Sequence, residues 1–162
     1  MSGTEIYVRV ADLRTGAGSD VLITVGLGSC VAILLYDPSA RVGGLAHVLL
    51  PSPGLGRKDA NPAKFPQTAL PLLLELMGKH GGRAQRMTAR LAGGASMFAS
   101  LASPGTIQMG ERNIVACRQA LYQHGLPVSA QATGGDYGRT VRLWACDGRV
   151  EVSSVAHGVC TL

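Results

Sequence analysis

TVGLGSCVAILLYDP, residues 24–38, is the stretch around which the rest of the 162-residue chain is organised. Val31 to Tyr36 is a short apolar run closed by Asp-Pro, which predicts a buried strand followed by a turn. Glycines at positions 26 and 28 allow other backbone to approach the segment before this strand closely. The sequence therefore places Cys30 at the mouth of a buried strand.

Two further predicted strands flank this stretch and carry a hydroxyl and an imidazole. Residues 21–25 (VLITV) are rich in β-branched side chains and include Thr24. Residues 43–51 (GGLAHVLLP) form the strand on the other side and include His47. A strand, a turn and a second strand bring His47 back toward Cys30. Three strands are therefore expected to converge on a cysteine, a histidine and a threonine.

The same segments resemble the CheD family of chemoreceptor glutamine deamidases. The resemblance begins with Thr-x-Gly-Leu-Gly-Ser-Cys-Val-Ala from residue 24, followed by Tyr-Asp-Pro and Gly-Gly-Leu-Ala-His-Val-Leu-Leu-Pro. Three more motifs follow in the family's order: GGASMF at 93–98, GERN at 110–113 and GGDYGR at 134–139. The resemblance covers nearly the whole chain. It implies a single deamidase domain over residues 1–162 that converts receptor glutamine side chains to glutamate.

Amide hydrolysis needs a nucleophile and a group that moves protons, because the carbonyl is resonance-stabilised and ammonia must leave protonated. We assign Cys30 as nucleophile and His47 as base and acid, and expect its imidazolium to lower the thiol pKa from about 8.5. Thr24 is expected to accept a hydrogen bond from the other ring nitrogen and to fix the tautomer. The expected oxyanion donors are backbone N–H groups of the turn at Gly28, Ser29 and Cys30.

Glycine-rich segments and a loop are expected around this site. The expected walls of the substrate groove are Gly93, Gly94, Gly134, Gly135 and Arg139. Tight turns with no contact to substrate are the alternative interpretation of the glycine pairs. Residues 51–62 are rich in proline and glycine, and a loop of this length is a candidate lid.

Composition limits the partners and the location. With 46% hydrophobic residues, the chain can form one domain with a sizeable core. The net charge is +5, but the basic residues are scattered and aromatic residues make up only 4%, which argues against nucleic-acid binding and favours an acidic protein partner. No apolar segment reaches about 20 residues and no secretion signal is present, so we expect no membrane insertion and a cytoplasmic location.

The remaining cysteines and histidines are not expected to bind a metal. Cys117, Cys146 and Cys160 are interpreted as small core residues, and all four cysteines as thiols. His157 and Cys160 have a ligand-like spacing, but one pair does not make a zinc site. The glycines at 26 and 28 lack the third glycine of a dinucleotide loop. We therefore expect neither a metal nor another cofactor.

Strands outnumber helices, and the helices are not regularly interleaved with them, which predicts an α+β fold. The expected architecture is a layered sandwich of mainly antiparallel sheets, and the resemblance implies that helices pack outside it. Helices are predicted over residues 64–79 and 110–125, and residues 14–20 are predicted to be a flexible connector. The other predicted strands are residues 6–10, 87–92, 128–133, 140–146 and 150–155.

Three functions are compatible with the sequence. The first is a protein-glutamine deamidase, which the resemblance directs to the cytoplasmic helices of methyl-accepting chemoreceptors. The second is another cysteine hydrolase, such as a toxin-like deamidase or a protease, because a thiol and an imidazole do not specify their acyl donor. The third is a non-catalytic adaptor that binds receptors or a CheC-type phosphatase, a partner that the resemblance also implies.

Overall fold

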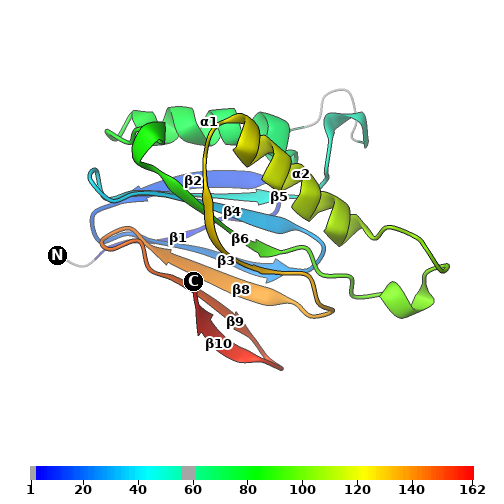
Figure 1. The fold of residues 1–162 in the computed structure, drawn as a ribbon. Coiled ribbons are helices and arrows are strands. Elements are labelled where there is room, and N and C mark those ends of the chain that lie inside the picture. Colours follow the sequence, from blue (N-terminus) through cyan, green and yellow to red (C-terminus); the bar gives the residue numbers. More distant parts are fainter. Residues whose placement is uncertain (1–2, 56–60) are drawn as a thin grey trace.

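The computed structural model describes residues 3–55 and 61–162, which form two five-stranded sheets and two α-helices (Figure 1). One sheet has the order β1 (Glu5–Tyr7), β3 (Val21–Leu27), β8 (Arg139–Trp144), β9 (Val150–Ser154) and β10 (Gly158–Thr161). The other has the order β2 (Asp12–Ala17), β5 (Val42–Val48), β4 (Val31–Asp37), β6 (Thr88–Gly93) and β7 (Val128–Thr133). Six of the eight strand pairings in the described chain are antiparallel.

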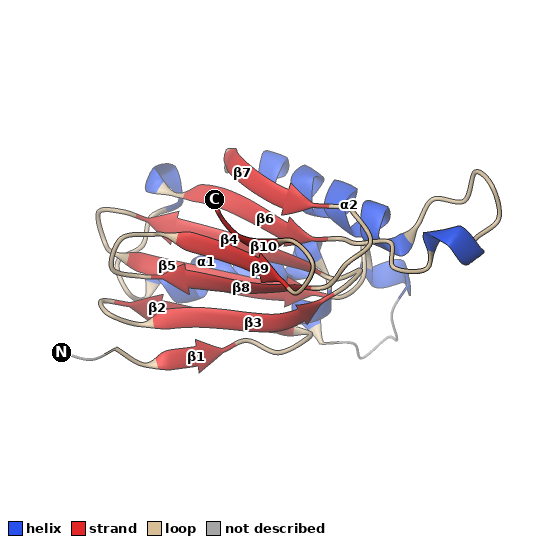
Figure 2. Cartoon of the chain, turned by 90° about the horizontal axis from the view of Figure 1, so that it is seen from below, coloured by secondary structure: helices blue, strands red, loops and turns tan. Residues whose placement is uncertain are grey.

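The two helices, α1 (Pro66–Gly78) and α2 (Met109–Gln123), cover the outer face of the sheet that contains β4. Figure 2, which views the molecule from the side of β8 and β9, shows both sheets in front of the helices. Strand β4 is buried on both faces. Val31, Ile33 and Leu35 pack with the helices, whereas Ala32 and Leu34 pack with the facing sheet. The predicted α+β layered sandwich with helices outside is confirmed.

Two strands escape prediction from sequence. Residues 14–20 were expected to be a connector, and that expectation is wrong because Asp12–Ala17 forms β2, antiparallel to β5. Strand β4 covers one edge of β5, and the other edge offers unpaired backbone groups that β2 satisfies in spite of its turn-forming residues. Strand β10 is exposed along its length, so no alternation of apolar residues marks it.

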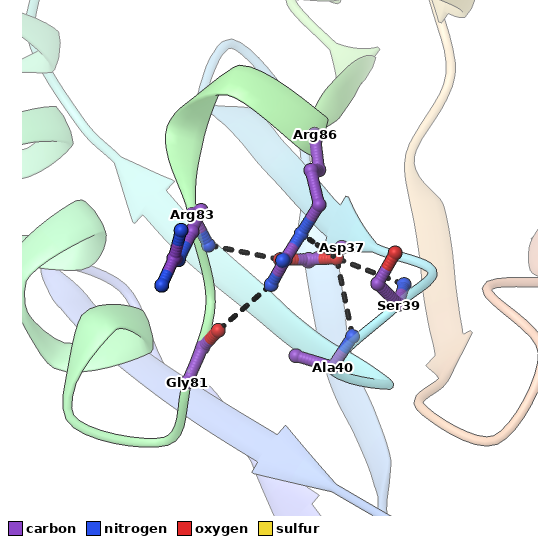
Figure 3. Close-up of polar contacts among 6 residues, drawn as sticks. All are labelled: Asp37, Ser39, Ala40, Gly81, Arg83 and Arg86. Carbon is purple, nitrogen blue, oxygen red and sulfur yellow. Dashed lines mark hydrogen bonds and ion pairs between the residues drawn. The ribbon is translucent and has the colours of Figure 1, made fainter.

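The C-terminal end of β4 holds a buried carboxylate whose hydrogen-bond partners are shown in Figure 3. The donors to Asp37 are the backbone N–H groups of Ser39, Ala40 and Arg83 and the guanidinium of Arg86, at 2.8–3.2 Å. Burial alone would raise the pKa of Asp37, but these donors lower it to about 2. The ionised carboxylate therefore fixes the turn after β4 to the segment that precedes β6.

The predicted lid, residues 51–62, is described only at its flanks, and residues 56–60 lie outside the described residues. The flanks include short 3₁₀ turns at Pro53–Leu55 and Pro62–Lys64. Asn61 donates through Nδ2 to the Ala11 carbonyl at 2.7 Å. The lid therefore stays a prediction, as does the extent of the domain. No helix in residues 3–55 and 61–162 is long and apolar enough to cross a membrane.

Candidate active site

His47 lies on β5 between the two sheets and is bonded to the sheet opposite its own. It pairs with Ala32 across the β4–β5 ladder. Its Nδ1 lies 2.7 Å from Thr24 Oγ1 on β3. Thr24 Oγ1 in turn donates to the Val8 carbonyl at 2.6 Å. Both His47 and Thr24 are completely buried, so this pair links the two sheets in the interior of the sandwich.

These two hydrogen bonds assign the tautomer of His47. A threonine hydroxyl has one proton, and in this structure that proton goes to the Val8 carbonyl. Oγ1 must therefore accept from Nδ1–H, which leaves Nε2 with a lone pair and no proton. Nε2 is buried and has no hydrogen-bond partner among the described residues. The interior thus contains a basic nitrogen that is free to accept a proton.

The protonation state of the imidazole follows from its burial. Desolvation disfavours the imidazolium and lowers the pKa of His47 to about 4. The ring is therefore neutral at physiological pH. A neutral ring with its proton on Nδ1 can act as a base through Nε2.

Cys30 lies immediately before β4, in the apolar cluster between the sheets. It shares this cluster with Leu27 and Leu34. The side chain of Cys30 is 7% exposed, whereas His47 and Thr24 are 0% exposed. Cys30 is therefore the most exposed of the three residues.

The register of the β4–β5 ladder brings Cys30 and His47 to one face. Val31 pairs with Val48, and the pair before it along β5 is Ala32 with His47. Cys30 lies in the same apolar cluster as Ala32, the residue paired with His47, so Cys30 and His47 face the same side of the sheet. The structure thus joins Thr24 and His47 directly and places Cys30 on the same side of the sheet, with no hydrogen bond between its thiol and Nε2 among the described residues.

The thiol pKa differs from the sequence-based expectation. Burial raises the pKa of Cys30, and its own backbone N–H offsets only part of that effect. The expectation that an imidazolium lowers the thiol pKa is wrong for the resting protein, because burial disfavours both charged forms. Cys30 and His47 therefore rest as a neutral thiol and a neutral imidazole.

The turn that carries Cys30 is held by three long-range hydrogen bonds to consecutive carbonyls. The Gly28 carbonyl accepts from Ala95 N–H at 2.8 Å, the Ser29 carbonyl from Asn113 Nδ2 at 2.9 Å, and the Cys30 carbonyl from Gly94 N–H at 2.8 Å. Gly28 and Ser29 lie in this turn as predicted. Their role as oxyanion donors stays a prediction.

The first glycine pair packs directly against this turn. Gly93 has φ +106°, and a Cβ atom there would collide with the Cys30 carbonyl. Gly94 is equally crowded, because its Cβ would collide with Ile114 of α2. Only glycine fits at these positions, since both the space and the backbone conformation exclude a side chain. Gly93 and Gly94 therefore support the turn that carries Cys30 from inside the protein.

The second glycine pair and Arg139 form an adjoining turn. Gly134 N–H donates to the Gly93 carbonyl at 3.0 Å, and Ser96 N–H donates to the Gly135 carbonyl at 2.9 Å. Arg139 is 4% exposed and donates through Nη1 to the Gly134 carbonyl at 2.8 Å. These contacts join the turn to the end of β6. The role of both glycine segments and Arg139 as groove walls stays a prediction.

Sequence reasoning missed the role of Asn113, although the GERN motif contains it. Asn113 is fully buried and lies on the same face of α2 as Cys117, Ala120 and Leu121. The spacing i, i+4, i+7, i+8 is that of an apolar helix face, on which a polar side chain is unusual. That position within the pattern was the signal available from the sequence.

The other three cysteines differ in their burial. Cys117 is buried, and burial raises its pKa, which agrees with a core residue. The interpretation of Cys146 and Cys160 as core residues is wrong, because both are exposed: Cys146 lies in the turn after β8 and Cys160 on β10. All four cysteines are free thiols. Across residues 3–55 and 61–162, no three His, Cys, Asp or Glu side chains group so as to hold a metal ion.

Comparison with known proteins gives consistent matches along the chain. A family model described as CheD chemotactic sensory transduction matches residues 49–154. A protein of Caldanaerobacter subterraneus subsp. tengcongensis is 41% identical over 98% of each chain, and one of Clostridium novyi is 40% identical over 98% of each chain. A protein of Clostridium botulinum is 37% identical over the full length of both. Each of these relatives is named probable chemoreceptor glutamine deamidase CheD.

Proposed function

The chain belongs to the CheD family, and on that premise we propose that it hydrolyses glutamine side chains of chemoreceptors to glutamate, with release of ammonia, in chemotaxis adaptation. The observation that carries the proposal is the neutral, buried His47, whose Nε2 has no partner among the described residues. This base lies on the same inward face as Cys30 and is oriented by Thr24.

In the first half of the reaction, Cys30 attacks the amide carbonyl while its proton moves to His47 Nε2. The ring then carries a positive charge, and its Nδ1–H remains bonded to Thr24 Oγ1, which preserves the orientation. The tetrahedral intermediate collapses when Nε2–H gives its proton to the leaving nitrogen. The C–N bond breaks, ammonia departs and a thioester to Cys30 remains.

In the second half, Nε2 takes a proton from a water molecule, and the resulting hydroxide attacks the thioester carbonyl. The C–S bond breaks, the thiolate recovers the proton from Nε2–H, and the product is a glutamate side chain. Backbone N–H groups of the Gly28 and Ser29 turn are the proposed oxyanion donors in both halves. Removal of one such donor typically costs about 3 kcal/mol of transition-state stabilisation.

The limited exposure of Cys30 favours a substrate in which a narrow side chain is carried by a large protein. Because Cys30 is only 7% exposed, we propose that substrate reaches it through a narrow entry that suits the unbranched glutamine chain. Contacts outside the narrow entry must then supply the binding energy that positions the amide, and a receptor helix offers such contacts where free glutamine does not. We place this reaction in the cytoplasm, on the cytoplasmic helices of methyl-accepting receptors. A CheC-type phosphatase as an additional partner stays a prediction.

The test is incubation of the protein with a receptor cytoplasmic fragment, followed by ammonia measurement and mass spectrometry. We expect an increase of about one mass unit per converted glutamine, without cleavage of the chain, since an amide NH₂ is exchanged for OH. Cys30→Ser should abolish the reaction, and Cys117→Ala should retain it. Chain cleavage would indicate a protease, and binding without a mass change would indicate an adaptor. A kcat/KM for free glutamine equal to that for the fragment would indicate a small-molecule glutaminase.

A further inference from the structure

Asn113 connects the two segments that carry Cys30 and His47. Its Nδ2 group donates to the Ser29 carbonyl at 2.9 Å and to the Leu49 carbonyl at 3.1 Å. Ser29 directly precedes Cys30, and Leu49 follows His47 by two residues. One side chain of α2 therefore bridges the nucleophile's turn and the end of the strand that carries the base.

This bridge lies where the strand ladder has ended. The last pair of β4 and β5 at this end is Val31 with Val48, so Ser29 and Leu49 lie beyond the regular backbone pairing. Backbone hydrogen bonds of the ladder fix the spacing of residues within it, but they do not fix the spacing beyond it. The two hydrogen bonds from Asn113 perform that function for the segment next to Cys30.

The orientation of the Asn113 amide is determined by its partners. Both partners are carbonyl oxygens, so the group that faces them must be the NH₂ and not Oδ1. Oδ1 is buried without a hydrogen-bond partner among the described residues. A buried acceptor without a partner destabilises the fold. The amide is present on an otherwise apolar helix face although one of its two polar groups has no partner, and the bridge to Ser29 and Leu49 gives a reason for it.

The start of α2 is itself fixed to the cysteine turn. A Cβ atom at Gly110 would collide with the carbonyls of Gly94 and Ala95, so the helix approaches this segment closely. The N–H groups of the same two residues hold the Cys30 and Gly28 carbonyls. Asn113 therefore acts from a helix that is packed rigidly against the turn.

We propose that Asn113 is a positioning residue that sets the separation and orientation of the Cys30 thiol relative to His47. This inference rests on the proposed cysteine mechanism. Misplacement of reacting groups by about 1 Å can reduce a rate by about 10²-fold. Because Asn113 is fully buried, its loss should alter the chemical step and not the contacts with a receptor.

The first variant is Asn113→Asp, which keeps the shape of the side chain and replaces the donor NH₂ by oxygen. Asn113→Ala removes both hydrogen bonds without adding a charge, and it serves if the aspartate variant does not fold. In the folded variants we expect kcat on a receptor fragment to fall by about 10- to 100-fold, with KM within about twofold of wild type. We also expect a changed rate of Cys30 alkylation by iodoacetamide across pH 6–10.

Cys117→Ser is the matched control. Cys117 lies one helical turn further along the same buried face, and a hydroxyl there destabilises the core without contact to Ser29 or Leu49. This variant should lose stability but retain kcat and the alkylation profile of Cys30. If Asn113→Asp and Asn113→Ala both retain kcat within twofold of wild type, the positioning role is wrong while the deamidase proposal stands. The same conclusion follows if their loss of kcat is no larger than that of Cys117→Ser. If the wild-type protein does not deamidate the fragment, the deamidase proposal fails, and unchanged alkylation in the Asn113 variants then overturns the positioning role as well.

Discussion

At the C-terminal end of β4, buried Asp37 receives hydrogen bonds from three backbone N–H groups and from Arg86. At the N-terminal end, Cys30 and its neighbour His47 are also buried, yet Nε2 of His47 has no partner in the described chain. The carboxylate is charged and fully bonded, whereas the thiol and the imidazole are neutral. Polar groups at the two ends of β4 are thus buried in two opposite ways.

The difference separates a structural polar group from the groups that we propose to react. A buried group with all its partners, such as Asp37, stabilises one arrangement of the chain and has no capacity left for a substrate. A buried group with a partner missing costs about 1–3 kcal/mol, and active sites are where such costs are retained. The two ends of β4 should therefore respond differently to substitution, to pH and to loss of a hydrogen bond.

The largest effect is expected at the reactive end. His47→Ala removes the proposed base, and kcat/KM on a receptor fragment should fall by about 10²–10⁴-fold. The fold should persist, because the substitution also removes a buried nitrogen without a partner. Steady-state kinetics, with circular dichroism as a check on folding, measures both. Activity above a tenth of the wild-type value would mean that another group acts as base.

Asp37→Asn should produce the opposite result. The amide cannot replace a carboxylate that accepts from four groups, and Arg86 would lose its charged partner, so the unfolding free energy should fall by about 3 kcal/mol. The kcat of the folded fraction should not change. Urea unfolding together with kinetics tests this, with Glu151→Gln, at the exposed ion pair with Arg149, expected to cost less than about 1 kcal/mol. A parallel loss of kcat would show that the two ends are coupled.

Acid should affect the two ends in separate pH ranges. The folded-state pKa of His47, about 4, is below the unfolded value of about 6.5, so its contribution of about 3 kcal/mol is present above pH 6.5 and lost as pH falls through 4. The folded-state pKa of Asp37 is about 2 against about 3.9 when unfolded, so its contribution of about 2–3 kcal/mol is lost as pH falls from about 4 through 2.

Unfolding free energies measured from pH 7 to pH 2 should show both steps. His47→Ala should remove the step between pH 6.5 and 4, and Asp37→Asn the step below pH 4. The acid limb of kcat/KM should likewise lie near pH 4, because Nε2 must be unprotonated to act as a base. An acid limb near pH 6.5 would contradict the burial of His47 in the working enzyme.

The smallest effect is expected for Thr24→Val. The methyl group keeps the shape of the side chain but removes the acceptor for Nδ1–H and the donor to Val8, which should cost about 1–2 kcal/mol of stability. Because the His47 imidazole would no longer be held in one orientation, kcat should also fall about 10-fold. Thr24→Ser, which keeps the hydroxyl, should restore most of both. Equal kcat values for the valine and serine variants would limit Thr24 to a structural role.

Much of the reactive end is predictable from sequence because its groups are local. Thr24 on β3, Cys30 just before β4 and His47 on β5 are close in the sequence, so short connections keep them near one another even though β3 belongs to the opposite sheet. The residues that hold the cysteine turn are less predictable because they are distant from it in the sequence. Asn113 resembles any other polar helix residue until Ser29 and Leu49 are placed beside it.

The thiol pKa and strand β2 were mispredicted for the same reason. A motif gives the identity of neighbouring groups, but the raised pKa of Cys30 depends on how completely the fold removes water. Residues 12–17 contain turn-forming residues, yet they pair along β5 because that edge would otherwise be unsatisfied. Burial and edge pairing are properties of the assembled sheets, whereas composition is a property of the segment.

The long-range support of the cysteine turn also sets when the nucleophile becomes available during synthesis. Thr24, Cys30 and His47 leave the ribosome early, but the groups that hold the turn are contributed by residues 94, 95 and 113. Strand β8, residues 139–144, which pairs with β3, is synthesised later still. For much of its translation the nascent chain therefore carries every proposed catalytic side chain with an ordinary, solvated thiol, and activity is acquired only when the last third of the chain has been made.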